Sequence, residues 1–595
     1  MTETIKVSDY IIRLLEKQGV KHIYGMIGGF ITNLVDSTYG DKGNNIKFIN
    51  CYHEQAASFA IAAAAKYTNK LQVAMTTSGP GATNLITGIC DAYFDSCPIL
   101  LITGQVNTSD LKGNKGVRQN GFQETDIVNI VKPITKYSVL IDKAENVETE
   151  FKKAIRIAIS DRPGPVLIDI PNDIQRREII VSDSSYEIEI DNKVIGLSTE
   201  KLQRVVDLLK EAKLPLILSG GGCSRVGSKK YITNFAERLD LPVVVSLMGK
   251  DSFDHHHPLF AGFIGSYGNR SGNLLLSKSD VLLVLGSRLD SRQTGNILTP
   301  FKDKIVIWVD VDINEINDNL IKPEIVFNTD VNFFLKTLLS RISDVNLTVT
   351  RKEYVKLLSY LKKKYAPENE LKLIGENNWH YLILKKISKI LDDDDVVCVD
   401  VGQNQMLSAQ TIMITKSQRF INSGGMAPMG YALPAAIGIT NETKKRCVVI
   451  VGDGGMHVNI QELNSISKGK HNIIIIVLNN SSLGLLRQFQ DLYFNSRYIG
   501  TDSSSGYHDC NFKEIAQAYG IKSVRINQFT KDINRVLEDL FSNNGSPVLL
   551  EVMLDCGSKV YPKLRFDKPL DEISPTLPDD ERKKIDFWFE NIKKS

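Results

Sequence analysis

One stretch near the C-terminal end constrains the fold of this chain more than any other. Two apolar runs, 447–451 and 473–478, are separated by a helical pattern and end at Gly452-Asp453-Gly454 and at Asn479-Asn480. Short apolar runs between glycine and asparagine breakers are typical of buried parallel strands joined by a crossing helix. Asp453 and Asn480 are therefore predicted at the carboxyl ends of two strands, where open α/β sheets bind their ligands.

These strand ends suit a cation bound together with a phosphate. The carboxylate of Asp453, the amide oxygen of Asn480 and the loop carbonyl of Ser482 match the oxygen ligands of Mg²⁺, which often bridges protein carboxylates to phosphate oxygens. The glycines allow a diphosphate to approach the backbone, and the following helix offers free N–H groups. A lone Gly-Asp-Gly more often only ends a strand, so the prediction depends on its spacing from Asn480.

The pairing of GDG at 452–454 with NN at 479–480 resembles the signature of enzymes that use thiamin diphosphate (ThDP). Over residues 5–555 the chain is similar to the acetohydroxyacid (acetolactate) synthase family, catalytic large-subunit type. Segments that match this family in order are Glu54, SGPG at 78–81, GFQE at 121–124, VDVGQNQMLSAQ at 399–410 and SGGMAPMGYALPAAIG at 423–438. The segment RFDKPLDEISPTLPDDE at 565–581 resembles the end of a branch that transfers an acetyl unit from pyruvate to nucleotide-linked keto-deoxysugars.

Helical and strand patterns alternate in three parts of the chain, which predicts an α/β protein with three consecutive doubly wound parallel-sheet domains. The resemblance implies their roles as pyrimidine-binding (1–185), central FAD-binding-like (197–345) and diphosphate- and Mg-binding (373–570), followed by a tail (571–595). The polar stretch 182–193 is predicted to be a linker. Residues 1–19 are predicted to form an amphipathic helix capped by Ser8.

The resemblance implies how the coenzyme would be held. Glu54 would hydrogen-bond the pyrimidine ring so that the coenzyme's own amino group acts as the base, although alone an acid here would more often stabilise a helix N-terminus. Met429 would wedge beneath the coenzyme. The implied ThDP residues are Glu54, Gly402, Gln403, Asn404, Ala427, Met429, Gly452, Asp453, Gly454, Gly455, Met456 and Asn480, and the implied metal ligands are Asp453, Asn480 and Ser482.

The family's reaction predicts that pyruvate loses CO₂ and that its two-carbon unit joins a second carbonyl. Gly29 and Gln123 are carried over beside Glu54 as catalytic residues, with Gln123 hydrogen-bonding a developing alkoxide. The substrate pocket would contain Phe30, Phe122, Leu485 and Phe489. In the family the glutamate of one subunit reaches the coenzyme of another, so a homodimer or homotetramer is expected, and a small regulatory subunit is a further possible partner.

Four positions depart from the family pattern. Phe489 replaces its acceptor-pocket Trp, Phe30 replaces a small residue, Asn172 replaces the lysine of PKD and Ser291 replaces an aspartate. The acceptor is therefore either a 2-oxo acid, such as a second pyruvate, or a nucleotide-linked 4-keto-deoxysugar that would give a branched-chain sugar. Arg487 would either meet an anion near this pocket or be an ordinary surface arginine.

Four segments of the middle part resemble the family's FAD-binding domain: GGGC at 220–223, GFIG at 262–265, SRLDSRQTG at 287–295 and WVDVD at 308–312. Glycine turns bring the backbone to a pyrophosphate, arginines supply cations and aspartates accept from ribose or adenine. The implied residues are Gly220, Gly221, Gly222, Gly262, Gly265, Arg288, Asp290, Arg292, Asp310, Asp312 and Asp330. The flavin would have a non-redox role, whereas a flavin-dependent pyruvate oxidase or a non-enzymatic flavin-binding subunit are the alternatives.

Composition limits the other classes of function. The net charge of +3 gives no sign of a nucleic-acid partner. The N-terminus lacks the apolar core of a signal peptide, and no apolar run reaches the roughly 18 residues needed to cross a membrane. The eight cysteines contain no CxxC pair and are expected to be reduced. A cytoplasmic enzyme with no membrane partner is the expectation.

Overall fold

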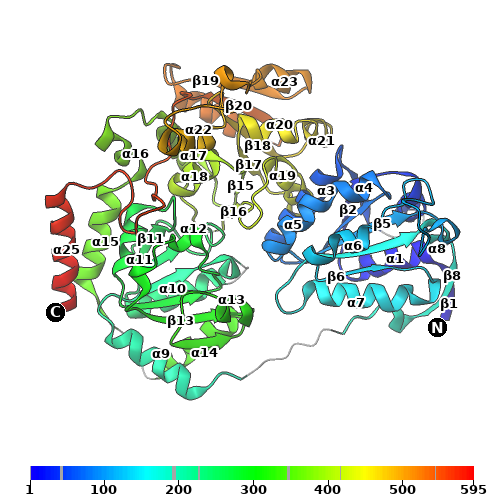
Figure 1. The fold of residues 1–595 in the computed structure, drawn as a ribbon, viewed down its shortest axis with the longest axis horizontal. Helices are drawn as coiled ribbons and strands as arrows, with labels where there is room; N and C mark the ends of the chain where they lie inside the picture. The colour runs from blue at the N-terminus through cyan, green and yellow to red at the C-terminus, as the bar shows by residue number, and fades with distance from the viewer. Residues whose placement is uncertain are drawn as a thin grey trace.

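The structure of this chain is a computed structural model that describes residues 2–40, 45–189, 196–224, 228–344, 349–415, 417–542 and 545–594. Within these residues lie three six-stranded parallel sheets, each with helices on its faces, and one two-stranded antiparallel sheet. The predicted α/β class with three doubly wound parallel-sheet units is confirmed. In Figure 1 the N-terminal unit lies at one end of the molecule, and the other two units lie together at the opposite end.

The N-terminal unit contains Glu54, which begins a helix shortly after strand β3. Its strands β4 and β5 are buried along their whole length, as expected for parallel strands covered on both faces. The strand order is β3 (Lys47–Asn50), β2 (His22–Met26), β4 (Gln72–Thr76), β5 (Ile99–Gln105), β7 (Val166–Pro171) and β6 (Tyr137–Leu140). The helices are α1 (Val7–Lys17), α2 (Thr32–Asp36), α3 (Glu54–Thr68), α4 (Pro80–Asn84), α5 (Ile86–Phe94), α6 (Ile127–Val131), α7 (Val147–Ile159) and α8 (Asn172–Gln175).

The central sheet repeats this arrangement between residues 216 and 328. Its strand order is β11 (Phe260–Phe263), β10 (Val243–Val245), β9 (Leu216–Ser219), β12 (Val281–Leu285), β13 (Ile305–Asp310) and β14 (Ile325–Asn328). The accompanying helices are α9 (Thr199–Glu211), α10 (Ser228–Leu239), α11 (Arg270–Lys278), α12 (Ser291–Thr294), α13 (Ile313–Asn317) and α14 (Val331–Asp344).

The C-terminal sheet contains the two strands predicted from the apolar runs, now β17 and β18. They pair in parallel, with Gly452 beside Leu478, so their carboxyl ends lie next to each other. The strand order is β16 (Arg419–Ile421), β15 (Val396–Val399), β17 (Cys447–Gly452), β18 (Ile473–Asn479), β20 (Val548–Met553) and β19 (Lys522–Ile526). The helices are α17 (Trp379–Ile390), α18 (Gln403–Thr411), α19 (Ala432–Thr443), α20 (Asp453–Val458), α21 (Glu462–Lys468), α22 (Gly484–Tyr493), α23 (Phe512–Ala518) and α24 (Ile533–Phe541).

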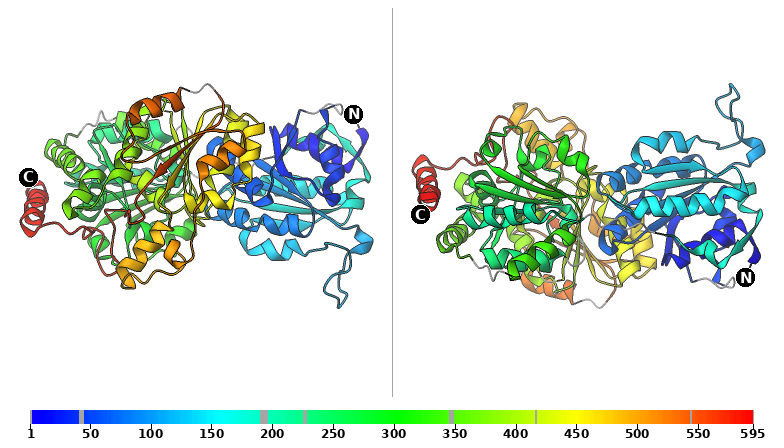
Figure 2. Two further views of the ribbon diagram at one scale, coloured as in Figure 1. Left: turned by 90° about the horizontal axis from the view of Figure 1, so that it is seen from above. Right: turned by 90° about the horizontal axis from the view of Figure 1, so that it is seen from below.

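Small side chains let the N-terminal and C-terminal units approach closely. Helix α3 is rich in alanine and lies along α19, and a Cβ added at Gly438 would be 2.1 Å from the carbonyl oxygen of Ala60. Figure 2 shows these two units side by side in both views. The ring of Tyr431, just before α19, also contacts the ring of Phe59 with 5.5 Å between centroids. The contact between α3 and α19 therefore places both coenzyme-related segments within one packed core.

Two predictions about the first domain need correction. Residues Thr2–Lys6 form a strand, β1, which pairs antiparallel with β8 (Glu178–Ser182), so the first helix begins only at Val7. Ser8 does not cap this helix; its Oγ is buried and accepts a hydrogen bond from Ser37. Residues 2–6 form a strand because they pair with β8, which is distant in sequence, although their local pattern favours a helix. Part of the predicted linker is ordered as β8 and a 3₁₀ turn at Asp183–Tyr186, and residues 190–193 lie outside the described residues.

A buried ion pair attaches the tail to the central unit. The carboxylate of Glu370, in α16 (Pro367–Glu370), accepts two hydrogen bonds of 2.8 Å from Arg270, and both side chains are almost fully buried. Arg270 also donates to the carbonyls of Ile573 and Pro575. Beyond them, α25 (Asp579–Lys594) lies beside α15 (Lys352–Lys364), with Trp588 5.4 Å from the Tyr360 ring (Figure 1). Within the described residues, no helix has the length and apolar character needed to span a membrane.

We expect Glu370→Gln to lower the free energy of unfolding by about 3–5 kcal/mol, because it leaves the Arg270 cation buried without a counter-charge. Chemical denaturation followed by circular dichroism would measure the change. The matched control is Glu353→Gln, which breaks an exposed pair with Lys356 and should cost less than about 1 kcal/mol. Equal stabilities of the two variants would contradict the role given to this ion pair.

Candidate active site

Asp453 lies at the carboxyl end of β17 and begins α20. Its side chain is buried, and one carboxylate oxygen accepts a 2.8 Å hydrogen bond from the hydroxyl of Tyr507. Burial raises the pKa of Asp453 to about 6, against the opposite effect of the Tyr507 hydrogen bond. A buried carboxylate with one satisfied oxygen favours a cationic ligand. Tyr507 belongs to a loop that sequence reasoning did not single out.

Asn480 and Ser482 lie in the loop after β18. The Asn480 amide donates to the Gln403 side chain over 2.9 Å, and its oxygen accepts from the Ser482 N–H over 3.3 Å. The Ser482 carbonyl accepts from the Gly484 N–H over 2.9 Å and keeps a second lone pair. One carboxylate, one amide oxygen and one free carbonyl lone pair at a single sheet edge fit Mg²⁺ with a diphosphate.

Glycines provide the space around these groups. Gly402 has φ +125° at the start of α18, a conformation that side chains rarely adopt. A Cβ on Gly454 would be 2.9 Å from the Cε of Met429, and one on Gly455 would be 2.3 Å from an oxygen of Asp400. The segment with Met429 therefore lies directly against the Asp453–Gly455 turn. Met456 is fully buried in the core behind it.

Asp400 organises this part of the site, although sequence reasoning missed it. Its carboxylate accepts hydrogen bonds from the N–H groups of Gly430 (3.0 Å) and Ala432 (2.8 Å), so it fixes the backbone just after Met429. Burial raises the pKa of Asp400 to about 6, and these backbone hydrogen bonds oppose that effect. The amide of Asn404 donates to the Asp400 carbonyl over 2.6 Å. An aspartate directly after the apolar run of β15 was the signal available in the sequence.

Glu54 is the first residue of α3 and is 7% exposed. Its carboxylate accepts a 2.9 Å hydrogen bond from Asn84 and lies against Gly81, both in the SGPG turn and helix that follow β4. Its neighbours Tyr52 and Gln55 contact the C-terminal unit, since the Tyr52 N–H donates to Glu462 over 2.8 Å. Glu54 is thus held by its own domain at the border with the C-terminal one. Asn84 is a further residue that the sequence did not indicate.

A buried charged network holds the loop that precedes Met429. Lys66, in the last turn of α3, pairs with Asp95 over 2.7 Å. The carboxylate of Asp95 accepts from the N–H groups of Gly424 and Gly425. The neighbouring Ser423 accepts a 3.0 Å hydrogen bond from the N–H of Ala427, which has a positive φ of +56°. Residues of the N-terminal unit therefore position the loop predicted to contact the pyrimidine.

The predicted substrate residues lie on two different units. Gly29 and Phe122 are exposed, the Phe30 carbonyl accepts from Gln175 over 2.7 Å, and the Gln123 carbonyl accepts from Ser78 over 2.7 Å. These four residues lie at the carboxyl ends of the N-terminal strands. Gln123 has a φ of +65°, so its backbone is strained toward the left-handed region. Leu485 and Phe489 lie on α22 of the C-terminal unit.

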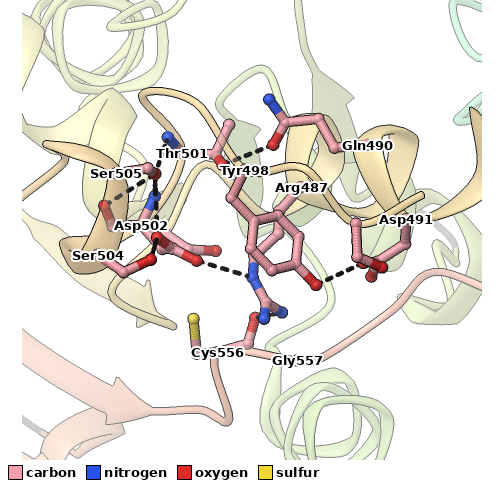
Figure 3. A network of polar contacts seen from close by, with 12 residues as sticks. Arg487, Gln490, Asp491, Tyr498, Thr501, Asp502, Ser504, Ser505, Cys556 and Gly557 are labelled. Carbon is pink, nitrogen blue, oxygen red and sulfur yellow. Dashed lines mark hydrogen bonds and ion pairs between the residues drawn. The ribbon is translucent and has the colours of Figure 1, made fainter. Parts of the chain in front are cut away.

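Arg487 on α22 is engaged in holding loops together. Figure 3 shows its guanidinium between Asp502 and the turn at Cys556, with the Tyr498 ring above it. Its Nε lies 3.2 Å from Asp502, its Nη1 donates to the Cys556 carbonyl over 3.0 Å, and the Tyr498 ring centroid is 4.4 Å away. Arg487 is therefore largely buried and already paired, and its contact with a substrate anion stays a prediction. The contacts with Asp502 and Tyr498 connect α22 to the loop that leads to Tyr507.

A cavity of the central unit contains seven of the predicted FAD residues, namely Gly221, Gly222, Arg288, Asp290, Arg292, Asp310 and Asp330. Burial raises the pKa of Asp310 to about 6. The same cavity is bordered by Lys66, Asp95, Gly424 and Gly425 of the loop network. Backbone N–H groups, two arginines and acceptor carboxylates along one cavity fit a dinucleotide with a pyrophosphate.

The other four predicted FAD residues have structural contacts instead. Gly220 and Gly265 lie against backbone, since added Cβ atoms would be 2.2 Å from the Gly286 carbonyl and 2.4 Å from the Arg292 carbonyl. Gly262 is within β11, with a φ of +115°. Asp312 pairs with Arg162 of the N-terminal unit over 3.0 Å and caps α13. None of these four residues lines the cavity, and their assignment to FAD stays a prediction.

Comparison with known families defines the class of this protein. Three segments match the domains described as "Thiamine pyrophosphate enzyme", namely the N-terminal TPP binding domain over residues 5–130, the central domain over 202–338 and the C-terminal TPP binding domain over 400–552. The three matched segments contain Glu54, the seven predicted FAD residues that line the cavity, and the Asp453–Asn480 edge, respectively.

Similar proteins indicate which family of thiamine pyrophosphate enzymes this chain belongs to. The chain is 33% identical to the acetolactate synthase large subunit of Lactococcus lactis, over 97% of this chain and 98% of the relative. It is 33% identical to that of Cyanidium caldarium, over 93% and 94%, and 32% identical to the isozyme 1 large subunit of Escherichia coli, over 93% and 95%. The chain belongs to the acetolactate synthase family of thiamine pyrophosphate enzymes.

Gly484 offers a test of the geometry around Asn480. A Cβ at this position would lie 2.4 Å from both the Asn480 amide nitrogen and the Gln403 side-chain oxygen. We expect Gly484→Ala to weaken binding of ThDP with Mg²⁺ about tenfold or more, although alanine at a helix start would otherwise favour the helix. Titration of coenzyme by fluorescence quenching would measure this. Gly116→Ala, with open space around the added carbon, should bind normally; a normal affinity in both variants would contradict the proposed crowding.

Proposed function

We propose that this protein is a ThDP- and Mg²⁺-dependent enzyme that decarboxylates pyruvate and joins the resulting two-carbon unit to a second carbonyl. The observation that supports it most is the group of Asp453, Asn480, Ser482 and Gln403 at the carboxyl ends of three adjacent strands, β15, β17 and β18. The relatives' names give the reaction class: they are acetolactate synthases. The flavin-dependent pyruvate oxidase and the non-enzymatic subunit have no comparable support.

The reaction balances without an oxidant. The C1–C2 bond of pyruvate breaks and releases CO₂, a new C–C bond forms to the acceptor carbonyl carbon, and the acceptor oxygen takes up one proton. When bound, ThDP supplies the electron sink that makes this cleavage possible. Asp453, Asn480 and the Ser482 carbonyl would hold Mg²⁺ and the diphosphate, with N–H groups of the Gly452–Gly455 turn and of the start of α18 completing the cradle.

The remaining residues orient the reacting groups. Asp400 and the Lys66 network fix the backbones of Met429 and Ala427, which would support the pyrimidine. Glu54, kept in place by Asn84, would share a hydrogen bond and its proton with a ring nitrogen of the pyrimidine and so assist proton transfer at the coenzyme. Gln123 and Gly29 would face the acceptor carbonyl at the carboxyl ends of the N-terminal strands. The hydrogen bonds of Asp400, Lys66 and Glu54 support the first two assignments, and the assignments of Gln123 and Gly29 follow from the family resemblance.

FAD is proposed for the central cavity, with Gly221, Gly222, Arg288 and Arg292 toward its pyrophosphate. Carboligation transfers no net electrons, so the flavin would stabilise structure. Its absorbance near 450 nm in purified protein, unbleached by pyruvate, is the expected result; bleaching by pyruvate would indicate the oxidase instead.

The acceptor is either a 2-oxo acid or a nucleotide-linked 4-keto-deoxysugar. The relatives' names favour acetolactate as product, so pyruvate or 2-oxobutyrate is the first acceptor to test. Release of ¹⁴CO₂ from pyruvate with no acetolactate, but with product restored by a keto-sugar, would select the second acceptor. The large-subunit name of the relatives also makes a small regulatory partner chain a proposal for this protein.

Glu54→Gln tests the catalytic acid. We expect this variant to bind ThDP with nearly unchanged affinity while its rate of CO₂ release falls about 100-fold or more, the size of a lost acid–base contribution. The affinity and the rate are measured on the same preparation. Glu462→Gln changes a neighbouring carboxylate that contacts Tyr52 and should affect the rate far less. An unchanged rate in Glu54→Gln would refute the assignment.

Subunit mixing tests whether the site lies between two chains. In one chain the contacts of Glu54 are with its own domain, and we propose that it completes the coenzyme site of a partner. Inactive Glu54→Gln and Asp453→Asn proteins, unfolded, mixed in equal amounts and refolded, should then regain about a quarter of wild-type activity, because half of the dimers contain one intact site. No recovery after demonstrated subunit exchange would place both residues in one chain's site.

A further inference from the structure

A buried lysine lies beside the predicted acceptor pocket. Lys563 is 6% exposed, and its Nζ finds no hydrogen-bond partner among the described residues. A buried ammonium without acceptors is costly, because it has lost its hydration without replacement. Its desolvation lowers the pKa of Lys563 to about 8, which still leaves it mainly protonated at neutral pH. Such a group is a candidate for contact with an anionic ligand.

Aromatic rings surround the ammonium. The Nζ lies 5.6 Å from the ring centroid of Tyr267, 5.7 Å from that of Phe489 and 5.5 Å from that of Tyr493. These distances allow cation–π attraction, which holds the charge in place but provides no hydrogen bond. The hydroxyl of Tyr493 is also buried and without a hydrogen-bond partner in the described part of the chain. Two unsatisfied donors therefore share one small cluster.

The backbone fixes this cluster between the central cavity and α22. Leu564 donates to the Ser266 carbonyl over 2.7 Å, and the Ser266 N–H donates to the Arg292 carbonyl over 2.8 Å. Ser266, Tyr267 and Arg292 all border the cavity. On the other side, Phe489 and Tyr493 lie on α22, where the acceptor pocket is predicted. The Tyr267 ring is thus both a wall of the cavity and a neighbour of the ammonium.

The same cluster extends to the protein surface. Phe566 is 59% exposed, and its ring contacts those of Phe489 and Tyr493 with centroid distances of 5.8 and 5.0 Å. Arg487, the other cation associated with α22, is already paired with Asp502 and the Cys556 carbonyl (Figure 3). Lys563 is therefore the better placed cation for an acceptor that approaches along α22.

We propose that Lys563, together with the Tyr493 hydroxyl, binds an anionic oxygen of the acceptor substrate and so determines which acceptors are used. The anion is a carboxylate if the acceptor is a 2-oxo acid and a phosphate if it is a nucleotide-linked keto-sugar. The inference rests on the proposed carboligase function. It adds Lys563, a specificity-determining residue shortly after β20, to a predicted pocket whose other residues lie at the N-terminal strand ends and on α22.

Kinetics with three acceptors test this proposal. Lys563→Met removes the charge at similar length, and Lys563→Arg keeps it. With saturating pyruvate as donor, products are quantified by mass spectrometry for 2-oxobutyrate, for a thymidine diphosphate-linked 4-keto-6-deoxyhexose and for neutral acetaldehyde. We expect Lys563→Met to raise the KM of one charged acceptor about tenfold or more, as a lost charge-assisted hydrogen bond predicts. The KM of acetaldehyde should stay constant, and Lys563→Arg should restore most of the loss.

The pattern across acceptors separates the outcomes. A KM effect on 2-oxobutyrate identifies the carboxylate, and one on the nucleotide sugar identifies the phosphate. Lys362→Met, at a half-buried lysine that also lies beside an aromatic ring, is the control and should change none of the constants. An equal change for acetaldehyde, or no change for either charged acceptor, would overturn the proposal. If wild-type protein releases no CO₂ from pyruvate, the carboligase function itself fails, and this inference falls with it.

Discussion

The parallel pairing of β17 with β18 is the constraint on which the rest of this structure depends. Because Gly452 lies beside Leu478, the residues that follow the two strands emerge at one edge of the sheet. The buried carboxylate of Asp453 and the amide oxygen of Asn480 therefore lie at the same sheet edge, although the two residues are far apart in the sequence. The hydrogen bond from Tyr507 partly offsets the free-energy cost of burying the Asp453 carboxylate. A bound cation would offset this cost further.

The coenzyme edge depends equally on the N-terminal unit. Helix α3 provides Glu54 at its start and Lys66 at its end, and its alanine face lies against α19. Lys66 and Asp95 then hold the Gly424–Gly425 backbone, which borders the central cavity as well as preceding Ala427 and Met429. Helix α3 therefore connects all three units. We expect a change in the central cavity to alter the position of the loop before Met429.

The residues predicted to bind the acceptor lie in different kinds of structural element from those predicted to bind the coenzyme. Most residues predicted to bind the coenzyme lie at strand ends and in first turns of helices, whereas Ala427 and Met429 lie in the loop before α19. The predicted acceptor residues lie on α22, after β2 and in the 121–124 loop, where Phe122 is exposed. Phe489 belongs to the aromatic cluster that surrounds the ammonium of Lys563. We therefore expect substrate choice to depend on the side chains of this cluster.

The features that local pattern controls could be predicted from the sequence. The apolar runs predicted the strands and the glycine and asparagine breakers predicted their ends, because periodicity and chain breaks are local properties. The spacing from Asp453 to Asn480 predicted that both lie at one sheet edge, which the pairing of β17 with β18 confirms. Only the tertiary structure decided contacts between residues far apart in sequence: Asp400 on Gly430, Lys66 on Asp95, β1 on β8, and Asp312 on Arg162 rather than at the cavity. Arg487 and Lys563 show why. Both are cations near α22, and only the arrangement of distant loops makes one of them fully paired and leaves the other among aromatic rings.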